Sequence, residues 1–180
     1  MGPRYSAPDV LSSAVHVSLE GGLSALTFGR VAEHLGSSDR MVVYYFPTKT
    51  DLVAAVVAEL GTELQQLLGV AFGDEPATPD QLVKAAWPVL SSKRGDRIFA
   101  VFFEMIGLAS SGLEPYASLT TSFMHSWADW LADRVKGSRP AVRRQRALGV
   151  MARVDGLLML RRVMGPAAAE TAARELLRDG

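Results

Sequence analysis

Residues 26–51 read LTFGRVAEHLGSSDRMVVYYFPTKTD, and this stretch predicts two short helices on either side of a glycine turn. Thr27 is a suitable N-cap for the first helix, and apolar residues recur at three- and four-residue spacing as far as Leu35. Gly36 then permits the sharp turn that follows. Two helices joined in this way predict a helix-turn-helix, in which the second helix enters the major groove of DNA.

The second helix of this pair is expected to run through Tyr45, with Ser37 or Ser38 as its N-cap. Val42 and Phe46 are four residues apart, so they share one face and can pack on the core. That packing leaves the other faces of the helix exposed. The side chains on those faces are Asp39, Arg40, Val43 and Tyr44.

Helices are also predicted on both sides of this pair. One precedes it from Pro8 to about Glu20, and its inward side chains are expected to be Leu11, Ala14, Val15 and Leu19. A longer helix follows the pair, because Thr48 and Asp51 have the spacing of a capping box. Its apolar stripe consists of Val53, Val56, Val57, Leu60, Leu64, Leu67 and Leu68.

The helical pattern continues to the end of the chain. Further helices are expected at 79–93, 95–110, 114–136, 139–164 and 166–178, separated by glycine and proline. No alternation of polar and apolar residues favours a strand. The predicted fold class is therefore all-α, with a three-helix DNA-binding domain at 1–47 and a second, helical domain at 48–180.

Composition excludes several kinds of protein. The chain has 180 residues, is 48% apolar, and contains no cysteine, which excludes disulfides and thiolate chemistry. It has three scattered histidines, so neither a metal site nor a cofactor is expected. No secretory signal or long apolar run is present, so we expect a cytoplasmic protein without a membrane partner. The net charge is zero, so DNA affinity would depend on shape and symmetry more than on general attraction.

The first fifty or so residues resemble the TetR family of bacterial transcriptional repressors. The match is a set with fixed spacing, namely Thr27, Ala32, Leu35, Gly36, Ser38, Tyr44, Tyr45, Phe46, Thr48, Lys49 and Leu52. The resemblance implies a homodimer that binds a nearly palindromic operator in double-stranded DNA and is released by a small-molecule effector. The expected DNA-contacting residues are Thr27, Ser38, Asp39, Arg40, Met41, Val43, Tyr44, Tyr45 and Lys49.

The chain departs from the family pattern in its recognition helix. Val43 replaces a tyrosine that usually holds a phosphate, and it can instead touch a thymine methyl, while Tyr44 or Tyr45 can supply the phosphate contact. Arg40 replaces a small residue and is suited to bind guanine O6 and N7. Asp39 either accepts from cytosine N4 or favours the N-terminus of its helix. Ser37 replaces a buried valine.

The middle helices concentrate bulky side chains, most of which are expected to be ordinary core. Some of them can line an effector pocket, since helical bundles often contain apolar cavities with a few polar groups. The expected ligand-binding residues are Phe102, Glu104, Met105, Thr120, Phe123, Trp127 and Asp155. Glu104 is the strongest polar candidate, although a solvated or arginine-paired acid is an equal alternative.

The last two long helices carry more apolar surface than a peripheral hairpin needs. The residues concerned are Leu148, Met151, Val154, Leu157, Leu158 and Leu160, together with the alanine-rich helix from Pro166. We expect these helices to pair with their copies in a second subunit. The arginines at 139, 143, 144 and 146 are read as a solvated helix face in preference to a second nucleic-acid patch.

Two other functions are considered. A helical enzyme could use Glu104 and His125 as acid and base, but no nucleophile, phosphate loop or metal spacing accompanies them, so we expect no enzyme. A dimerisation or adaptor protein that has lost specific DNA binding is the main alternative to a regulator. Val43 and the neutral N-terminal region favour that alternative.

Overall fold

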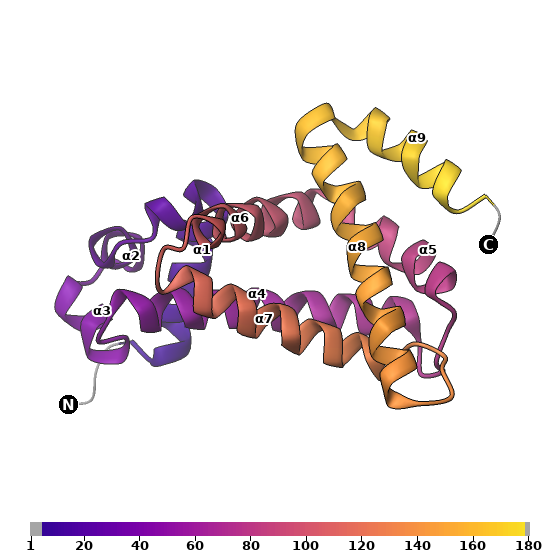
Figure 1. Ribbon diagram of the computed structural model, residues 1–180. Helices are drawn as coiled ribbons and strands as arrows, with labels where there is room; N and C mark the ends of the chain where they lie inside the picture. Colours follow the sequence, from indigo (N-terminus) through magenta and orange to yellow (C-terminus); the bar gives the residue numbers. More distant parts are fainter. Residues whose placement is uncertain (1–4, 179–180) are drawn as a thin grey trace. The chain divides into compact units, whose positions relative to one another are not determined.

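The computed structural model describes residues 5–178, and these residues form nine helices with one isolated bridge between Ala77 and Val135. In chain order they are α1 (Ala7–Ala25), α2 (Phe28–Leu35), α3 (Asp39–Tyr45), α4 (Lys49–Phe72), α5 (Pro79–Leu90), α6 (Lys93–Ser110), α7 (Tyr116–Ala132), α8 (Pro140–Met164) and α9 (Pro166–Leu176) (Figure 1). The all-α prediction is confirmed over this range, and the expected helices lie close to the observed ones.

The described chain forms two compact units. The first contains the residues up to Glu63 together with Ala100–Thr120, and the second contains Leu64–Phe99 together with the residues from Thr121 on. Helices α4, α6 and α7 each contribute residues to both units. The units do not coincide with the division after residue 47, which stays a prediction about the part of the chain that acts on DNA.

Helix α1 packs on α2 and α3 in the first unit through a face different from the expected one. Its buried residues before the glycines are Val10, Ser13, Ala14, Val17 and Ser18. The prediction of an inward Leu11, Val15 and Leu19 is wrong, since these three are only partly buried. A stripe chosen by bulk alone is displaced by one residue from the true contact face.

Two serines explain the choice of face on α1. Ser18 Oγ donates to the carbonyl oxygen of Ala14 at 2.8 Å, and Ser13 Oγ is 3.0 Å from Nδ1 of His34 on α2. Both hydroxyls therefore have hydrogen-bond partners and can be buried without a large penalty. Their small size lets α1 approach α2 more closely than leucine would.

Helix α4 begins at the predicted capping box. Thr48 Oγ1 accepts from the Asp51 N–H at 3.1 Å, and the Asp51 carboxylate accepts from the Thr48 N–H at 3.0 Å. The predicted stripe of seven residues is buried except for Leu67, which is 43% exposed. By length and composition α4 is also apolar enough to cross a membrane, but a core helix passes the same test, and Val53 and Val56 are fully buried.

Helices α5, α8 and α9 pack together in the second unit. Helix α5 begins with a capping box between Thr78 and Gln81, with Pro79 as its first residue. Arg153 of α8 donates to Asp80 of α5 at 2.5 Å, and the indole of Trp87 donates to Glu170 of α9 at 3.0 Å. Helix α8 buries an apolar face that includes Val150, Val154 and Leu158.

Candidate nucleic-acid interface

The turn between α2 and α3 forms as its residues predict. Thr27 Oγ1 accepts from the Arg30 N–H at 3.2 Å and caps α2. Gly36 ends α2 with a φ of +67°, a left-handed conformation that favours glycine. The Ser37 N–H then donates to the Ala32 carbonyl at 2.9 Å. Residues close together in the chain therefore form the turn that joins α2 to α3.

Helix α3 is held by one fully buried side chain. Val42 has no exposed surface, and Phe46 at the end of the helix is partly buried. Ser38 occupies the N-cap position, but its hydroxyl makes no capping hydrogen bond. The helix thus rests on the core through Val42, as predicted, and is not stabilised by a side-chain cap.

The outward side of α3 carries the residues that were predicted to read DNA. Asp39 and Arg40 are exposed, Val43 is 39% exposed, and Tyr44 is 71% exposed. The arginine, carboxylate and hydroxyl groups of this face can form hydrogen bonds with base edges and phosphates. Met41 is partly buried beside them. The geometry places these residues together on one accessible face.

Tyr45 and Lys49 are less available to DNA than the exposed residues of α3. The Tyr45 hydroxyl donates to the backbone carbonyl of Tyr5 at 2.8 Å, and its ring is partly buried, so Tyr44 is better placed than Tyr45 for a phosphate. Lys49 is partly buried at the start of α4, and burial lowers the pKa of its ammonium group, while the charge of Glu104 raises it. Both remain predictions as DNA contacts.

The candidate effector residues divide between the two units. Phe102, Glu104, Met105 and Thr120 belong to the first unit, and Phe123, Trp127 and Asp155 belong to the second. The structure does not define them as one pocket, so their common role stays a prediction. Met105 is fully buried in the first unit and Trp127 is 9% exposed in the second, as expected of core residues.

Polar members of this set differ in how they are satisfied. Among the described residues, the hydroxyl oxygen of Thr120 is buried without a hydrogen-bond partner. Burial raises the pKa of the Asp155 carboxyl group to about 6. Glu104 is partly exposed, and its carboxylate accepts two backbone N–H groups. Its supposed catalytic companion, His125, lies with Nδ1 2.9 Å from the Arg144 guanidinium.

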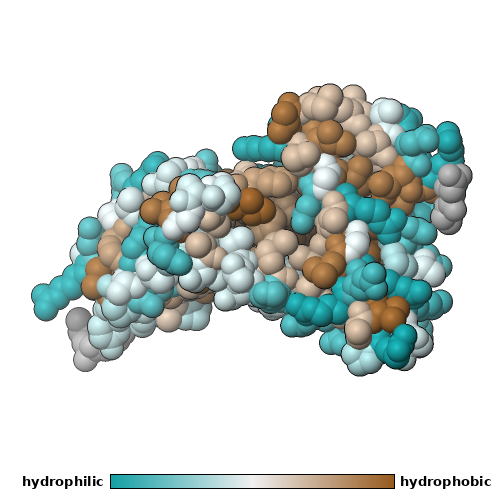
Figure 2. All heavy atoms as spheres, viewed as in Figure 1, coloured by the Kyte–Doolittle hydropathy of each residue, from teal (hydrophilic) through white to brown (hydrophobic). Residues whose placement is uncertain are grey.

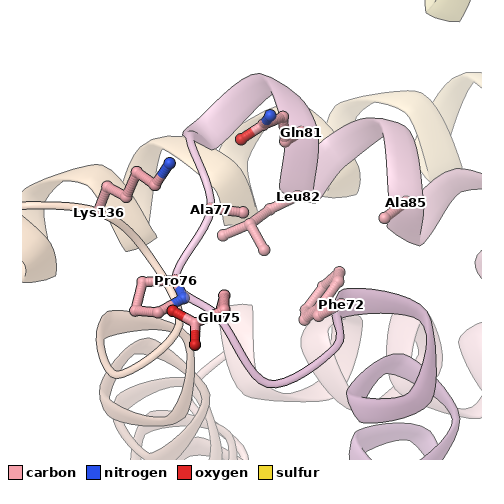
Figure 3. A pocket seen from close by; sticks show the side chains of 8 residues that line it. All are labelled: Phe72, Glu75, Pro76, Ala77, Gln81, Leu82, Ala85 and Lys136. Carbon is pink, nitrogen blue, oxygen red and sulfur yellow. The ribbon is translucent and has the colours of Figure 1, made fainter.

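A pocket of about 360 Å³ lies in the second unit, and sequence reasoning missed it. Its lining residues are Phe72, Glu75, Pro76, Ala77, Gln81, Leu82, Ala85 and Lys136 (Figure 3). None of the predicted effector residues lines it. The pocket forms where the loop after α4 bonds to the loop after α7, through Ala77 N–H to Arg134 and Lys136 N–H to Ala77. These loop contacts leave no periodic signal in the sequence.

Most of the predicted dimerisation residues of α8 are buried within the single chain. Val154, Leu157 and Leu158 are at most 8% exposed within the single chain, so they form its core. Of the predicted residues, Leu148 is exposed, and the other exposed apolar residues of α8 are Met159, Val163 and Met164. Figure 2 shows apolar surface over the turn where α8 meets α9. Apolar residues lie on both the buried and the exposed side of α8, which is why periodicity could not distinguish the two sides.

The first unit therefore has the geometry that defines the helix-turn-helix class. Its short second helix is anchored by Val42 and presents its outer face to solvent, after a glycine turn. Residues 10–56 match the family described as bacterial regulatory proteins, tetR family. The resemblance to the TetR family is thus confirmed, with these residues as its N-terminal domain.

Solved structures share the fold over nearly the whole chain. A TetR-family regulator from Rhodococcus sp. is 16% identical, with a TM-score of 0.75 over 96% of this chain and 95% of that one. A transcriptional regulator from Rhodococcus sp. Rha1 is 20% identical, with a TM-score of 0.74 over 97% and 95%. The multidrug binding protein EbrR, in complex with imidazole, is 16% identical, with a TM-score of 0.71 over 98% and 95%. No curated protein matches the sequence.

Proposed function

We propose that the chain is a transcriptional repressor that binds a nearly palindromic operator as a homodimer and releases it when a small molecule binds. The observation that carries this proposal is the outer face of α3, where Arg40, Val43 and Tyr44 are exposed on a helix anchored by Val42. Arginine can bind guanine in the major groove, and valine can contact a thymine methyl. Tyr44 can donate to a phosphate.

The exposed apolar residues of α8 support a dimer. Val163 is 78% exposed and Met164 is 67% exposed, which is unfavourable for side chains that remain in water. A Cβ added at Gly149 or Gly156 would meet nothing within 4 Å, so this helix leaves room for a second helix to approach. Pairing with a second copy would place two recognition helices roughly 34 to 36 Å apart, one turn of DNA.

The hydroxyl group of Thr120 and the similarity in fold to EbrR support a small-molecule effector. The buried Thr120 hydroxyl lacks a partner among the described residues, and a ligand or water would satisfy it. EbrR, which shares the fold, is a multidrug binding protein seen with imidazole and with proflavin. For this chain we propose a largely apolar effector that favours one of two conformations and moves the DNA-binding domain through α4. The site of action is the cytoplasm.

Selection from a pool of random DNA duplexes tests the proposal. We expect one enriched inverted repeat, because a two-fold symmetric dimer reads two identical half-sites. Retention of all sequences alike, with steep loss in salt, would instead support the helical adaptor protein without specific DNA binding. A triple variant with Arg40, Val43 and Tyr44 replaced by alanine is the matched control, and it should lose the enrichment while it keeps the fold.

A further inference from the structure

A break in α1 places two backbone amides next to a carboxylate of α6. Gly22 has a φ of +76° and a ψ of −177°, so α1 is interrupted just before its end. The Leu23 N–H donates to Oε2 of Glu104 at 2.7 Å, and the Ser24 N–H donates to Oε1 at 2.9 Å. One carboxylate therefore binds two neighbouring amides with both of its oxygens.

Gly22 shows how closely this carboxylate approaches the backbone. A Cβ at residue 22 would lie 2.2 Å from Oε2 of Glu104, closer than real Cβ contacts occur. The positive φ is also a conformation that other L-residues rarely adopt. Gly22 and Glu104 are thus two parts of one arrangement, although the bonded residues are 80 and 81 positions apart in the chain.

The bonded segment lies directly before the helix-turn-helix. Leu23 is 1% exposed, Leu26 is fully buried, and Thr27 then caps α2. The two bonded amides therefore lie four and three residues before the N-cap of α2. Hydrogen bonds to a charged acceptor are roughly twice as strong as neutral ones, so this attachment is firm.

The same charge acts on two other helices of the first unit. Burial lowers the pKa of Lys49 at the start of α4, and Glu104 opposes that effect. Burial raises the pKa of Tyr116 at the start of α7, and Glu104 adds to the rise. The charge of Glu104 therefore acts on residues of α4 and α7 in addition to its bonds with the α1 amides, and one of these residues, Lys49, is a predicted phosphate contact.

We propose that Glu104 is a positioning residue for DNA binding, through which α6 holds the corner between α1 and α2 in the geometry that the operator requires. The inference rests on the proposed function and adds a connection from the middle helices to the recognition helix that does not pass through α4. Withdrawal of the carboxylate by a movement of α6 lowers operator affinity. Because both oxygens are used, a small rotation of α6 is enough to break the arrangement.

The experiment compares Glu104→Ala and Glu104→Gln with the wild type. Alanine removes both acceptors, whereas glutamine keeps the size and loses one acceptor, which guards against a variant that fails to fold. Glu59→Gln is the matched control, since Glu59 is an exposed acid of α4 and its loss changes the net charge equally. Hydrogen exchange of the Leu23 and Ser24 amides is measured without DNA. Operator affinity is measured by fluorescence anisotropy at a temperature where all variants are folded and dimeric.

We expect faster exchange of both amides in the two Glu104 variants and no change in the control. The operator Kd should rise about tenfold or more, because the fraction of chains in the competent conformation falls by the same factor. Gly22→Ala should have a similar effect. The double variant Gly22→Ala/Glu104→Gln should bind no more weakly than the weaker single variant, since both remove the same contact.

Each contrary result has a separate meaning. Unchanged protection of the two amides would show that the carboxylate does not hold them. Lost protection with an operator Kd within about twofold of the wild type would overturn the positioning role and leave the proposed function intact. A wild-type chain that selects no duplex contradicts the proposed function and the positioning role together, whereas the amide protection would persist.

Discussion

Helices α3 and α8 both present side chains to solvent, but of different chemistry and on different supports. The 7 residues of α3 rest on Val42 and expose Asp39, Arg40 and Tyr44. The 25 residues of α8 bury one apolar face and expose another, which includes Met159 and Val163. An exposed face with hydrogen-bonding groups suits base edges and phosphates, whereas an exposed aliphatic face suits another helix.

The contrast teaches how one chain can separate two kinds of recognition. Polar side chains on α3 lose little when they remain in water, so this helix can stay exposed until DNA is present. Aliphatic side chains on α8 gain about 25 cal/mol for each Å² that they bury, so their exposure favours association. The following variants test whether the two faces act as this comparison requires, starting with the largest expected effect.

Leu157→Glu should destabilise the folded chain most. Leu157 is 3% exposed, so glutamate loses core packing and places an unpaired charge inside the second unit. We expect a loss of about 3 to 5 kcal/mol in the free energy of unfolding, measured by thermal or urea denaturation. This replaces the simple expectation from the sequence that Leu157 is an interface residue. A variant as stable as the wild type would show that Leu157 is not core.

Val163→Glu should leave the fold intact and separate the dimer into monomers. The side chain is 78% exposed in the single chain, so the charge costs little there but would be buried in the proposed interface. Sedimentation measures the oligomeric state. Val70→Glu is the matched control, because Val70 is 87% exposed on α4 and lies outside α8 and α9. A dimer that persists in Val163→Glu would move the interface to another surface.

Asp155→Asn should make the chain more stable at neutral pH. Burial raises the pKa of Asp155 to about 6 from 3.8, so the folded state favours the protonated carboxyl group. The contribution of Asp155 to the free energy of unfolding is complete below about pH 4 and is lost as the pH rises through about 6. Asparagine removes this loss, so we expect a gain of at most about 3 kcal/mol at pH 7.5 and almost none at pH 4. Parallel stability curves for the two proteins across this range would contradict the prediction.

Arg40→Ala should relax the preference at one base pair of each half-site. A bidentate contact to guanine contributes about 1 to 3 kcal/mol of discrimination, and the exposed position of Arg40 on α3 permits it. Repeating the duplex selection measures the change. Arg139→Ala removes an exposed arginine from the start of α8 and should leave the selected sequence unchanged. An unaltered base preference in Arg40→Ala would exclude this residue from the readout.

Lys49→Ala should weaken binding to all sequences about equally. A phosphate contact carries no sequence information, so the slope of log K against log salt should fall by about one unit. Lys84→Ala, which removes an exposed lysine of α5, is the control. An unchanged salt slope would indicate that the partly buried Lys49 acts inside the protein, near Glu104, and not on DNA.

Local signals predicted the helix-turn-helix almost completely. Thr27, Gly36 and Asp51 each act on backbone groups within a few residues, so their effects can be read from spacing alone. The inward face of α1 was predicted wrongly because Ser13 and Ser18 are buried through bonds that depend on α2 or on the helix backbone. The size and polarity of the α1 side chains, considered without α2, therefore predicted the wrong buried face.

The sequence by itself determined the helices, their ends and the exposed residues of α3, because capping and periodicity act over one or two turns. Only the tertiary structure decided that Leu157 is core while Val163 is exposed. Helix α8 carries apolar residues on both sides, and periodicity does not indicate which side a neighbouring helix covers. The tertiary structure alone also placed Glu104 on the amides of Leu23 and Ser24, because a hydrogen bond between distant residues follows from packing and leaves no pattern in the chain.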